Sequence, residues 1–267
     1  MMTSTLAASG SGKRHGALWG ARAEAWAENE EQQVPTYEEA IRRVGVSPGD
    51  TVLEVGCGSG VFLRLAADRG ARAFGLDAAE PLIELARERV PEADLRVGDM
   101  QFLAYEDDCF DFVAGFNSFF FAADMVAALR EAGRVAKSGA PVVIQVWGRP
   151  ERCDLTAMKE AVFPLGPPPP PGASQPPPLW QPGVLEGIAG EAGLTPQDSF
   201  DLAYAFEYPD TEALVRRSLA PGLVVAAIQT AGEEAVRDAI VTSLEPYRTP
   251  DGGYSLENEW HYLIASA

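Results

Sequence analysis

Residues 51–60 read TVLEVGCGSG, and residues 61–68 continue as VFLRLAAD. A short apolar run ends in a turn with glycines at alternate positions, and residues that favour a helix follow at once. Glycine lacks the Cβ atom that would keep a ligand away from the backbone, and the start of a helix leaves N–H groups unpaired. The stretch predicts a strand, a tight turn and a helix N-terminus that faces a nucleotide-like ligand. The alternative is a plain turn between a strand and a helix.

The spacing of the glycines distinguishes two kinds of ligand. From Glu54 to Gly60 the pattern is E-x-G-x-G-x-G, whereas a turn that binds pyrophosphate reads G-x-G-x-x-G. An acid two residues before the first glycine suits a ligand with a charged amino-acid tail and no phosphate. The turn therefore favours such a ligand over a dinucleotide.

The charge balance argues against a nucleic-acid partner. The chain has 267 residues, 39 of them acidic and 21 basic, with a formal net charge of −18. Such a chain repels a polyanion unless a local basic patch offsets the total. The basic cluster near the N-terminus covers only residues 13–15. We therefore expect no nucleic-acid substrate, tRNA included.

Other features of the composition point to a cytoplasmic enzyme without metal. No apolar run approaches the ~20 residues that span a bilayer, and residues 1–12 lack the apolar core of a signal peptide. Cys57, Cys109 and Cys153 are too few and too widely spaced for a disulfide framework or a zinc site. We expect no metal and no membrane association, and a monomer or a homodimer.

A second pattern is the alternation of strands and helices between residues 46 and 150. Expected strands cover residues 51–55, 71–76, 94–97, 112–116 and 141–147, and expected helices cover residues 61–69, 80–90 and 124–135. Short connections between them predict an α/β fold with a doubly wound, mostly parallel sheet. Ligands bind beyond the carboxyl ends of the strands in such sheets, which is where Gly56, Asp77, Asp99 and Asn117 fall.

The flanking segments are expected to cover that edge of the sheet. Residues 1–12 are expected to form a mobile tail, and residues 13–33 and 36–44 two helices that can lie across the ligand site as a lid. For Trp19 and Trp26, lid and core packing are equally favoured. We divide the chain into an N-terminal helical lid (residues 1–45), a ligand-binding core (46–150) and a C-terminal part (151–267).

The C-terminal part begins with a proline-rich connection. Runs of proline at residues 167–171 and 176–178 indicate an extended segment over the surface. We expect a helix over residues 182–193, a strand over 199–208, helices over 210–219, 221–231 and 233–245, and a last strand over 258–265. The three consecutive helices would form a helical insertion before that last strand.

Five segments resemble, in order and spacing, the class I S-adenosylmethionine-dependent methyltransferases of the small-molecule, ubiquinone-biosynthesis-like type. They are LEVGCGSG at residues 53–60, GLD at 75–77, GDM at 98–100, FDFV at 110–113, and EAGRV at 131–135 with Ser138 and Gly139 before the fifth strand. The resemblance implies a seven-stranded Rossmann-like sheet with an antiparallel last pair. It also implies S-adenosyl-L-methionine as the cofactor and a small-molecule acceptor.

The resemblance also implies roles for single residues. The backbone of the turn, with Gly56, Cys57, Gly58 and Gly60, would cradle the methionine part, and Glu54 would help to order the turn. Asp77 would hold the ribose, Leu82 would pack on the adenine, Asp99 and Met100 would bind the adenine amino edge, and Asn117 would lie near the amino-acid tail. Tyr37 and Ala78 complete the expected cofactor site.

The acceptor is expected to be small and largely apolar, like a quinone or another natural product. His15, Trp19, Phe120 and Trp147 are the expected substrate-binding residues, and Phe116, Phe119, Phe121 and Trp180 add to an aromatic cavity unless they pack in the core. No catalytic base is assigned: the candidates are His15, His261, Tyr37 and Glu30. An exposed position for His15 and a structural role for His261 are favoured.

One departure from the family pattern and two alternative functions complete the interpretation. The fourth strand ends in Asn117-Ser118, not in the Asp/Asn-Pro-Pro-Tyr that marks enzymes methylating nucleic-acid amino groups or protein glutamine, so those acceptors lose support. One rival is a protein that holds the cofactor for a reaction without methyl transfer, such as a cyclisation. The other, a nicotinamide-dependent oxidoreductase, is disfavoured by the glycine spacing, by Asp99 and by the absence of a Tyr-x-x-x-Lys pair.

Overall fold

A computed structural model describes residues 10–169 and 176–267. Of the tail expected at residues 1–12, residues 1–9 lie outside these ranges, and so do residues 170–175 of the proline-rich segment. Residues 10–12 belong to helix α1 (Gly10–Gly20), so the expectation of a tail is wrong for them. The described chain contains a seven-stranded sheet in the order β3-β2-β1-β4-β5-β7-β6. The strands are β1 (Thr51–Val55), β2 (Arg72–Asp77), β3 (Asp94–Val97), β4 (Phe112–Phe116), β5 (Pro141–Trp147), β6 (Thr195–Tyr208) and β7 (Tyr254–Ser266).

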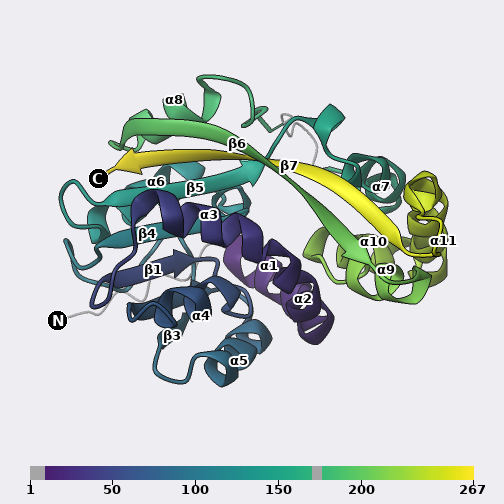
Figure 1. Ribbon diagram of the computed structural model, residues 1–267, viewed down its shortest axis with the longest axis horizontal. Coiled ribbons are helices and arrows are strands. Elements are labelled where there is room, and N and C mark those ends of the chain that lie inside the picture. The colour runs from purple at the N-terminus through teal and green to yellow at the C-terminus, as the bar shows by residue number, and fades with distance from the viewer. Residues whose placement is uncertain (1–9, 170–175) are drawn as a thin grey trace.

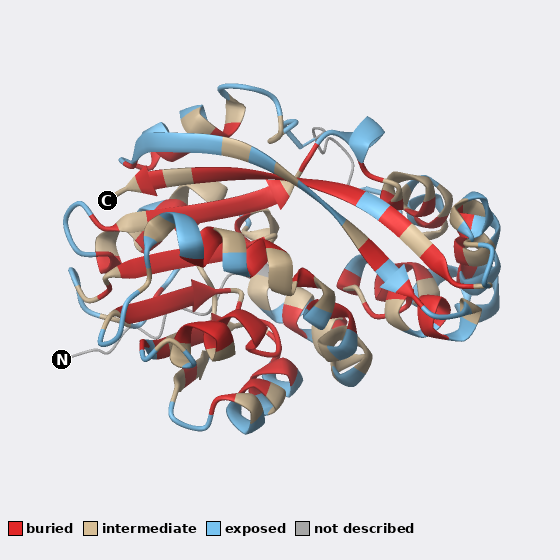
Figure 2. Cartoon of the chain, viewed as in Figure 1, coloured by how far each residue is buried: buried red, intermediate tan, exposed pale blue. Residues whose placement is uncertain are grey.

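The first five strands are parallel, and β7 pairs antiparallel with both β5 and β6. The expected α/β fold with an antiparallel last pair is therefore confirmed. Strand β1 shows why the sheet needs two layers of helices: Val52 belongs to one buried cluster and Leu53 to the other. Successive side chains of a strand point to opposite faces, so both faces of the central strands must be covered (Figure 2).

Helices α3, α4 and α5 cover one face, and α6 and α8 cover the other (Figure 1). Their bounds are α3 (Val34–Val44), α4 (Val61–Ala67), α5 (Glu80–Arg89), α6 (Met125–Val135) and α8 (Val184–Glu191). Pro35 lies in the first turn of α3, where its missing N–H leaves no helical bond unmade. Gly45 ends this helix in the left-handed conformation, with φ of 78°.

The N-terminal helix expected over residues 13–33 is interrupted. Helix α1 (Gly10–Gly20) and helix α2 (Ala23–Glu30) are separated by a turn, and the 3-10 helix η1 (Glu31–Gln33) leads into α3. Helix α1 packs on α5 and on α10 (Gly222–Ala231), and α2 packs on α5 and on α9 (Thr211–Ser218). These two helices thus join the sheet layer to the C-terminal helices.

The long strands β6 and β7 extend beyond the sheet and carry a helical cap at their far end (Figure 1). The cap consists of α7 (Leu155–Val162), α9, α10 and α11 (Glu233–Leu244), with α9 to α11 inserted before β7 as expected. Short 3-10 helices complete the described elements: η2 (Phe119–Phe121), η3 (Pro150–Arg152), η4 (Phe163–Leu165) and η5 (Glu245–Tyr247).

Three expectations for the C-terminal part are corrected. No element is expected over residues 148–166, yet α7 forms there. Strand β6 begins at Thr195, four residues earlier than expected, because it is an edge strand that tolerates Pro196 beside a register shift. Strand β7 begins at Tyr254 and not at residue 258, because its pairing with β6 continues to Tyr208.

Candidate functional site

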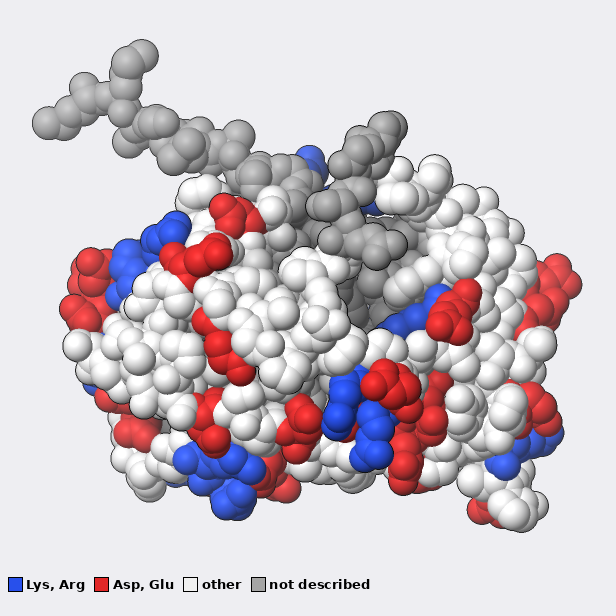
Figure 3. All heavy atoms as spheres, turned by 90° about the horizontal axis from the view of Figure 1, so that it is seen from above, with Lys and Arg blue, Asp and Glu red and all other residues white. Residues whose placement is uncertain are grey.

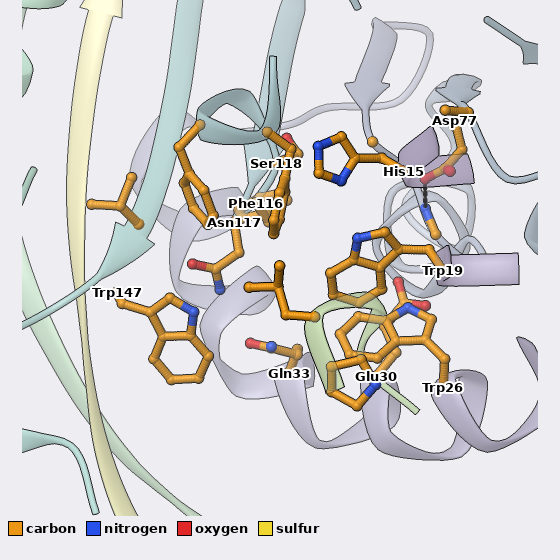
Figure 4. A pocket seen from close by; sticks show the side chains of 18 of the residues that line it. His15, Trp19, Trp26, Glu30, Gln33, Asp77, Phe116, Asn117, Ser118 and Trp147 are labelled. Carbon is orange, nitrogen blue, oxygen red and sulfur yellow. Dashed lines mark hydrogen bonds between the residues drawn. The ribbon is translucent and has the colours of Figure 1, made fainter. Parts of the chain in front are cut away.

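A cavity of about 690 Å³ lies at the carboxyl ends of the parallel strands. It is bounded by the turn after β1, the ends of β2 and β5, helices α1 and α2, and the cap. In Figure 4, Trp147 and Asn117 lie on one side of the cavity, and His15, Trp19, Trp26 and Asp77 lie on the other. The two sides of the cavity therefore offer different residues to a ligand.

The glycine turn adopts a conformation that side chains would prevent. Gly56, Gly58 and Gly60 all have positive φ, between 52° and 81°. A Cβ atom on Gly56 would lie 2.5 Å from Cβ of Ser118. The turn thus packs directly on the segment that follows β4, and the glycines are needed for backbone shape and for close approach.

The N–H groups of this turn already have acceptors within the protein. Those of residues 56 and 57 donate to the carbonyl oxygen of Leu76, at 2.7 and 3.1 Å, and that of residue 60 donates to the carbonyl of residue 57, at 2.9 Å. Those of residues 58 and 59 donate to carboxylates: to Asp77 Oδ2 at 2.9 Å and to Glu30 Oε2 at 2.8 Å. A phosphate would find these donors already bound to the carboxyl groups of Asp77 and Glu30.

Three buried or half-buried acids surround the turn: Glu30 from α2, Glu54 from β1 and Asp77 from β2. Glu30 also accepts from the hydroxyl of Ser59, at 2.7 Å. Asp77 Oδ1 accepts from the N–H of Ala79, at 2.8 Å. Glu54 makes no hydrogen bond to the turn, and its buried Oε2 has no partner within the described residues.

Burial raises the pKa of all three acids. The pKa of Glu30 rises to about 7, from an ordinary 4.5, although Ser59 and Arg89 act in the opposite direction. The pKa of Glu54 lies well above its ordinary value, through burial first and then through Glu30 and Asp77, and the pKa of Asp77 is raised by burial against its backbone hydrogen bonds. Arg89 offsets only part of the effect of burial on Glu30. A cationic ligand would add positive charge and so favour the ionised form of all three acids.

Most of the residues expected to bind the cofactor line the cavity. They are Tyr37, Gly56, Gly58, Asp77, Ala78, Leu82, Asp99, Met100 and Asn117. Glu54, Cys57 and Gly60 lie behind this wall: Cys57 is fully buried, and a Cβ atom on Gly60 would lie 3.1 Å from the Cβ of Ala86. These three shape the turn from inside the protein.

Asn117 combines two features that are uncommon away from functional sites. Its φ of 50° puts a side-chain-bearing residue in the left-handed region. Its side-chain Nδ2 donates to Gln145 Oε1, at 3.3 Å, while its buried Oδ1 has no partner among the described residues. An acceptor oxygen is therefore held at the cavity wall, ready for a donor group of a ligand.

The expected substrate-binding residues also line the cavity: His15, Trp19, Phe120 and Trp147. Trp19 packs edge-on against Trp26, with ring centroids 4.6 Å apart, and against Phe121, at 5.5 Å. His15 contacts Phe121 as well, at 5.3 Å. Helices α1 and α2 and the segment after β4 thus share one aromatic cluster at the cavity wall.

Among the other aromatic candidates, Phe116, Phe121 and Trp180 line the cavity. Phe119 does not: it is 1% exposed and packs in the core beside α6. In the 3-10 helix η2 Phe119 turns into the core while Phe120 and Phe121 line the cavity, a difference that the repeated sequence Phe-Phe-Phe could not reveal. Of the two alternatives left open for Phe119, cavity or core, the structure shows the core.

The candidate bases differ in their position relative to the cavity and in their pKa. His15 is half-buried on α1 and lines the cavity, so the expectation of an exposed tail position is wrong. Burial, with a smaller effect of Arg14, lowers its pKa below 6.5. His261 lies in β7 and is paired with Asp201 through Nδ1 at 2.7 Å, outside the lining of the cavity. The pKa of Tyr37 is raised well above 10 by burial and by Glu30 and Glu54, which disfavours it as a base.

Several residues of the site were not expected from the sequence. Gln33 and Lys159 line the cavity. Glu30 was considered only as a base, whereas it binds the glycine turn. A signal existed for Glu30, since it ends an N-terminal helix expected over the turn. None existed for Lys159, because α7 was not expected.

Two further classes of site find no support in the described part of the chain. Within it, no group of three or more His, Cys, Asp and Glu side chains is placed to hold a metal ion. The face drawn in Figure 3 carries acidic and basic side chains side by side, and the basic ones form no broad patch on it. Between residues 10 and 169 and from 176 onward, no helix has both the length and the apolar character needed to cross a membrane.

The strand order and the acid-lined glycine turn define a class of protein, the Rossmann-like methyltransferase fold. Two solved structures share it: the [4+2]-cyclase SpnF (TM-score 0.56, 20% identity, 87% of this chain and 80% of that one), and the YcgJ protein from a Bacillus species (TM-score 0.56, 16% identity, 87% and 97%). At such identities the likeness concerns the fold alone.

Sequence comparison gives the family. Residues 53–144 match the family model described as a methyltransferase domain. The malonyl-[acyl-carrier protein] O-methyltransferase of Serratia marcescens is 31% identical over 96 residues, which cover 36% of this chain and 38% of that protein. The demethylmenaquinone methyltransferase of Renibacterium salmoninarum is 31% identical over 110 residues, which cover 41% and 46%.

Residues 53–144 thus form a methyltransferase domain of the class I S-adenosylmethionine-dependent type. The matches span less than half the length of these curated relatives. The family model begins within β1 and ends within β5, before the cap.

Proposed function

We propose that the protein transfers a methyl group from S-adenosylmethionine to an oxygen, nitrogen or carbon atom of a small, largely apolar molecule. The observation that carries the proposal is the electrostatics of the glycine turn, where Glu30, Glu54 and Asp77 gather and the N–H groups are already used. This environment suits a ligand that brings cationic groups, as the sulfonium and ammonium of this donor do. It repels a phosphate.

The remaining roles follow from the family resemblance. Asp77 would hold the ribose, Leu82 would pack on the adenine, and Asp99 and Met100 would bind its amino edge. All four residues line the cavity, which supports the assignment. The amino-acid tail would lie over the turn, beside Glu30.

When bound, the donor supplies a methyl group on a positively charged sulfur, which is already a strong electrophile. The residues of this chain have to align the acceptor and exclude water. The aromatic cluster of His15, Trp19, Trp26 and Phe121 supplies an apolar wall for both tasks. Burial lowers the pKa of His15, which favours the neutral imidazole, the form that can take a proton from an acceptor that must lose one.

The division of the chain into parts remains part of the proposal. Residues 1–45 would act as a lid, residues 46–150 would bind the donor, and residues 151–267 would complete the sheet and shape the acceptor side. Support comes from the packing of α1 and α2 on both α5 and the cap. The aromatic cavity favours a cyclic apolar acceptor such as a quinone or another natural product. The name of the demethylmenaquinone methyltransferase, which denotes a quinone substrate, points the same way.

The site opposes one of the two alternative functions and does not distinguish the other from the proposal. A nicotinamide dinucleotide would bring its pyrophosphate to the acidic turn, so the observation that supports the proposal opposes this alternative. A protein that binds the donor without methyl transfer would show the same cofactor half. The fold shared with SpnF shows only the architecture, so this alternative has to be tested by product analysis.

Titration calorimetry with S-adenosylmethionine, S-adenosylhomocysteine and NAD tests the first half of the proposal. We expect binding of the first two and none of NAD; binding of NAD alone would refute the assignment. Incubation with isotope-labelled donor and a panel of apolar phenols, quinols and acids, followed by mass spectrometry, tests the second half. A labelled methylated product supports it. Conversion of an acceptor without label would support the non-methylating rival.

A further inference from the structure

Lys159 introduces a positive charge into the acceptor side of the cavity. It lies on α7, next to Met158, and both residues line the cavity together with Leu155 and Phe163. Its Nζ lies 3.8 Å from the ring centroid of Trp147, at the end of β5. The ammonium group is thus surrounded by apolar and aromatic groups and reaches solvent through the cavity.

No acidic group of the described residues neutralises this charge. No carboxylate lies within 4.0 Å of Lys159 Nζ, and the ammonium donates no hydrogen bond to them. The undescribed stretches 1–9 and 170–175 contain no aspartate or glutamate, so they cannot supply one. The ionisable group that acts on it most is the Cys153 thiol, whose own pKa is raised by burial.

Two arginines on the same segment, unlike Lys159, have an acidic partner. Arg149, which precedes η3, and Arg152, its last residue, both bind Glu259, with N–O distances of 3.0 and 3.3 Å. Glu259 is only 3% exposed, so the protein does bury an acid in this region where it pairs a charge. Lys159 has no such partner a few residues farther along the chain.

An unpaired ammonium in apolar surroundings is costly for the folded protein. Burial lowers the pKa of Lys159 to about 8, and the contact with Trp147 restores part of the lost hydration by a cation–π interaction. A leucine or methionine here would pack as well without that cost. A charged group retained in an apolar cavity is the usual means by which such a site orients its ligand.

We propose that Lys159 binds an acidic oxygen of the acceptor, so that the substrate is an apolar molecule carrying one carboxylate or one ionisable phenol or enol. This inference rests on the proposed function insofar as it calls the bound molecule an acceptor. The charge site itself requires only the cavity. The shared chemistry of the three groups is an oxygen that becomes anionic next to an ammonium.

The position of Lys159 also orients the acceptor. Trp147, which Lys159 covers, lies across the cavity from Asp77 (Figure 4). The acidic oxygen would therefore lie at the end of the cavity remote from the nucleoside. The atom that receives the methyl group would lie between Lys159 and the glycine turn, near Asn117.

Binding of small aromatic probes tests the inference without turnover. 2-Naphthoate, its neutral analogue 2-naphthamide, and 2-naphthol are titrated by calorimetry into the wild-type protein and into Lys159→Met, Lys159→Arg and Lys137→Met. The Lys137 variant is the matched control, because it also removes one positive charge, but from a surface pair with Asp111. Thermal unfolding of each variant confirms that it is folded.

We expect wild type to bind 2-naphthoate or 2-naphthol at least roughly tenfold more tightly than 2-naphthamide. Lys159→Met should abolish this preference, Lys159→Arg should keep most of it, and Lys137→Met should keep all of it. Preference for 2-naphthoate assigns the carboxylate class, and preference for 2-naphthol assigns the phenol or enol class. Equal binding of the three probes by wild type, or a preference that survives in Lys159→Met, would overturn the inference.

A spectroscopic measurement separates binding from a purely structural role. The chain has three lysines, at 13, 137 and 159, so reductive ¹³C-methylation gives few NMR signals. The Lys159 signal should titrate at higher pH after addition of 2-naphthoate and should not move with 2-naphthamide. S-adenosylhomocysteine binding should be the same in wild type and Lys159→Met. Its absence in wild type would refute the proposed function and leave the charge site standing.

Discussion

Replacement of Glu30 by glutamine tests the electrostatics of the glycine turn. Glu30 is 2% exposed and accepts hydrogen bonds from the N–H and the hydroxyl of Ser59. Glutamine has a similar shape and keeps one acceptor oxygen for those bonds, but it cannot ionise. Because burial holds the pKa of Glu30 at about 7, the substitution changes how stability depends on pH.

The sign follows from the two protonation equilibria. Below pH 4.5 the carboxyl is protonated in both the folded and the unfolded chain, and its contribution is constant. Between pH 4.5 and 7 the unfolded chain releases the proton while the folded chain keeps it, so the free energy of unfolding falls as pH rises. A pKa difference of about 2.5, at roughly 1.4 kcal/mol per unit, gives a loss of about 3 kcal/mol.

Urea unfolding of wild type and Glu30→Gln at pH 5 and pH 8 measures this effect. The stability of the variant relative to wild type should rise by about 2–3 kcal/mol from pH 5 to pH 8, since only wild type carries the buried ionisation. Glu31→Gln is the control: Glu31 ion-pairs with Arg89 and Arg64 at the surface. A Glu30→Gln difference that is the same at both pH values would refute the reasoning.

Two further predictions concern packing. Gly16→Ala would bring a Cβ atom to 2.1 Å from the carbonyl oxygen of Ala78, so α1 must move by roughly 1 Å and lose its packing against the end of β2. Amide exchange in residues 12–20 should therefore become faster, and S-adenosylhomocysteine binding should weaken. The control Gly190→Ala, whose Cβ atom would meet nothing within 4 Å, should change neither. Tyr262→Phe removes a buried hydroxyl that donates to the Thr36 carbonyl at 2.9 Å and should lower the free energy of unfolding by about 1–2 kcal/mol in urea titrations. Unchanged exchange in the first variant, or unchanged stability in the second, would contradict the respective packing argument.

The sequence predicts the cofactor half well because its signals are local. The strand of residues 51–55, the glycines after it and Asp77 are specified by residues close in the chain, and β1 and β4 have the expected bounds. The acids at the strand ends lie together because the carboxyl ends of parallel strands all lie at one edge of the sheet. The outline of this half of the cavity therefore follows from pattern and topology.

The acceptor half depends on contacts between distant segments, which one sequence does not reveal. Helix α7 is short, and it is held by α11, which follows it by more than 70 residues. Lys159 becomes a cavity residue only because this packing turns it toward Trp147. Likewise, the contact of Glu30 with the turn depends on where α2 ends. Residues of this kind could not be predicted, although they set the charge of the site.

The charges of the cavity give it a direction, with acids at the glycine turn and an ammonium at Lys159. A cationic donor is stabilised at the glycine turn and repelled by Lys159, and an anionic acceptor is stabilised at Lys159 and repelled by the acids. The charges therefore favour one placement of the two ligands, with the donor at the turn and the acceptor at Lys159. After methyl transfer the sulfur is neutral, and the acids around the turn lose part of their attraction for the product.

Wild type should therefore bind S-adenosylmethionine more tightly than S-adenosylhomocysteine at pH 8. Glu30→Gln should narrow that ratio, because a negative charge beside the ligand is lost, whereas Lys159→Met should leave it unchanged. Calorimetry with both ligands measures the ratio. If Glu30→Gln retains the wild-type ratio, the acidic cluster does not recognise the charge of the donor, and the glycine turn would bind it through shape alone.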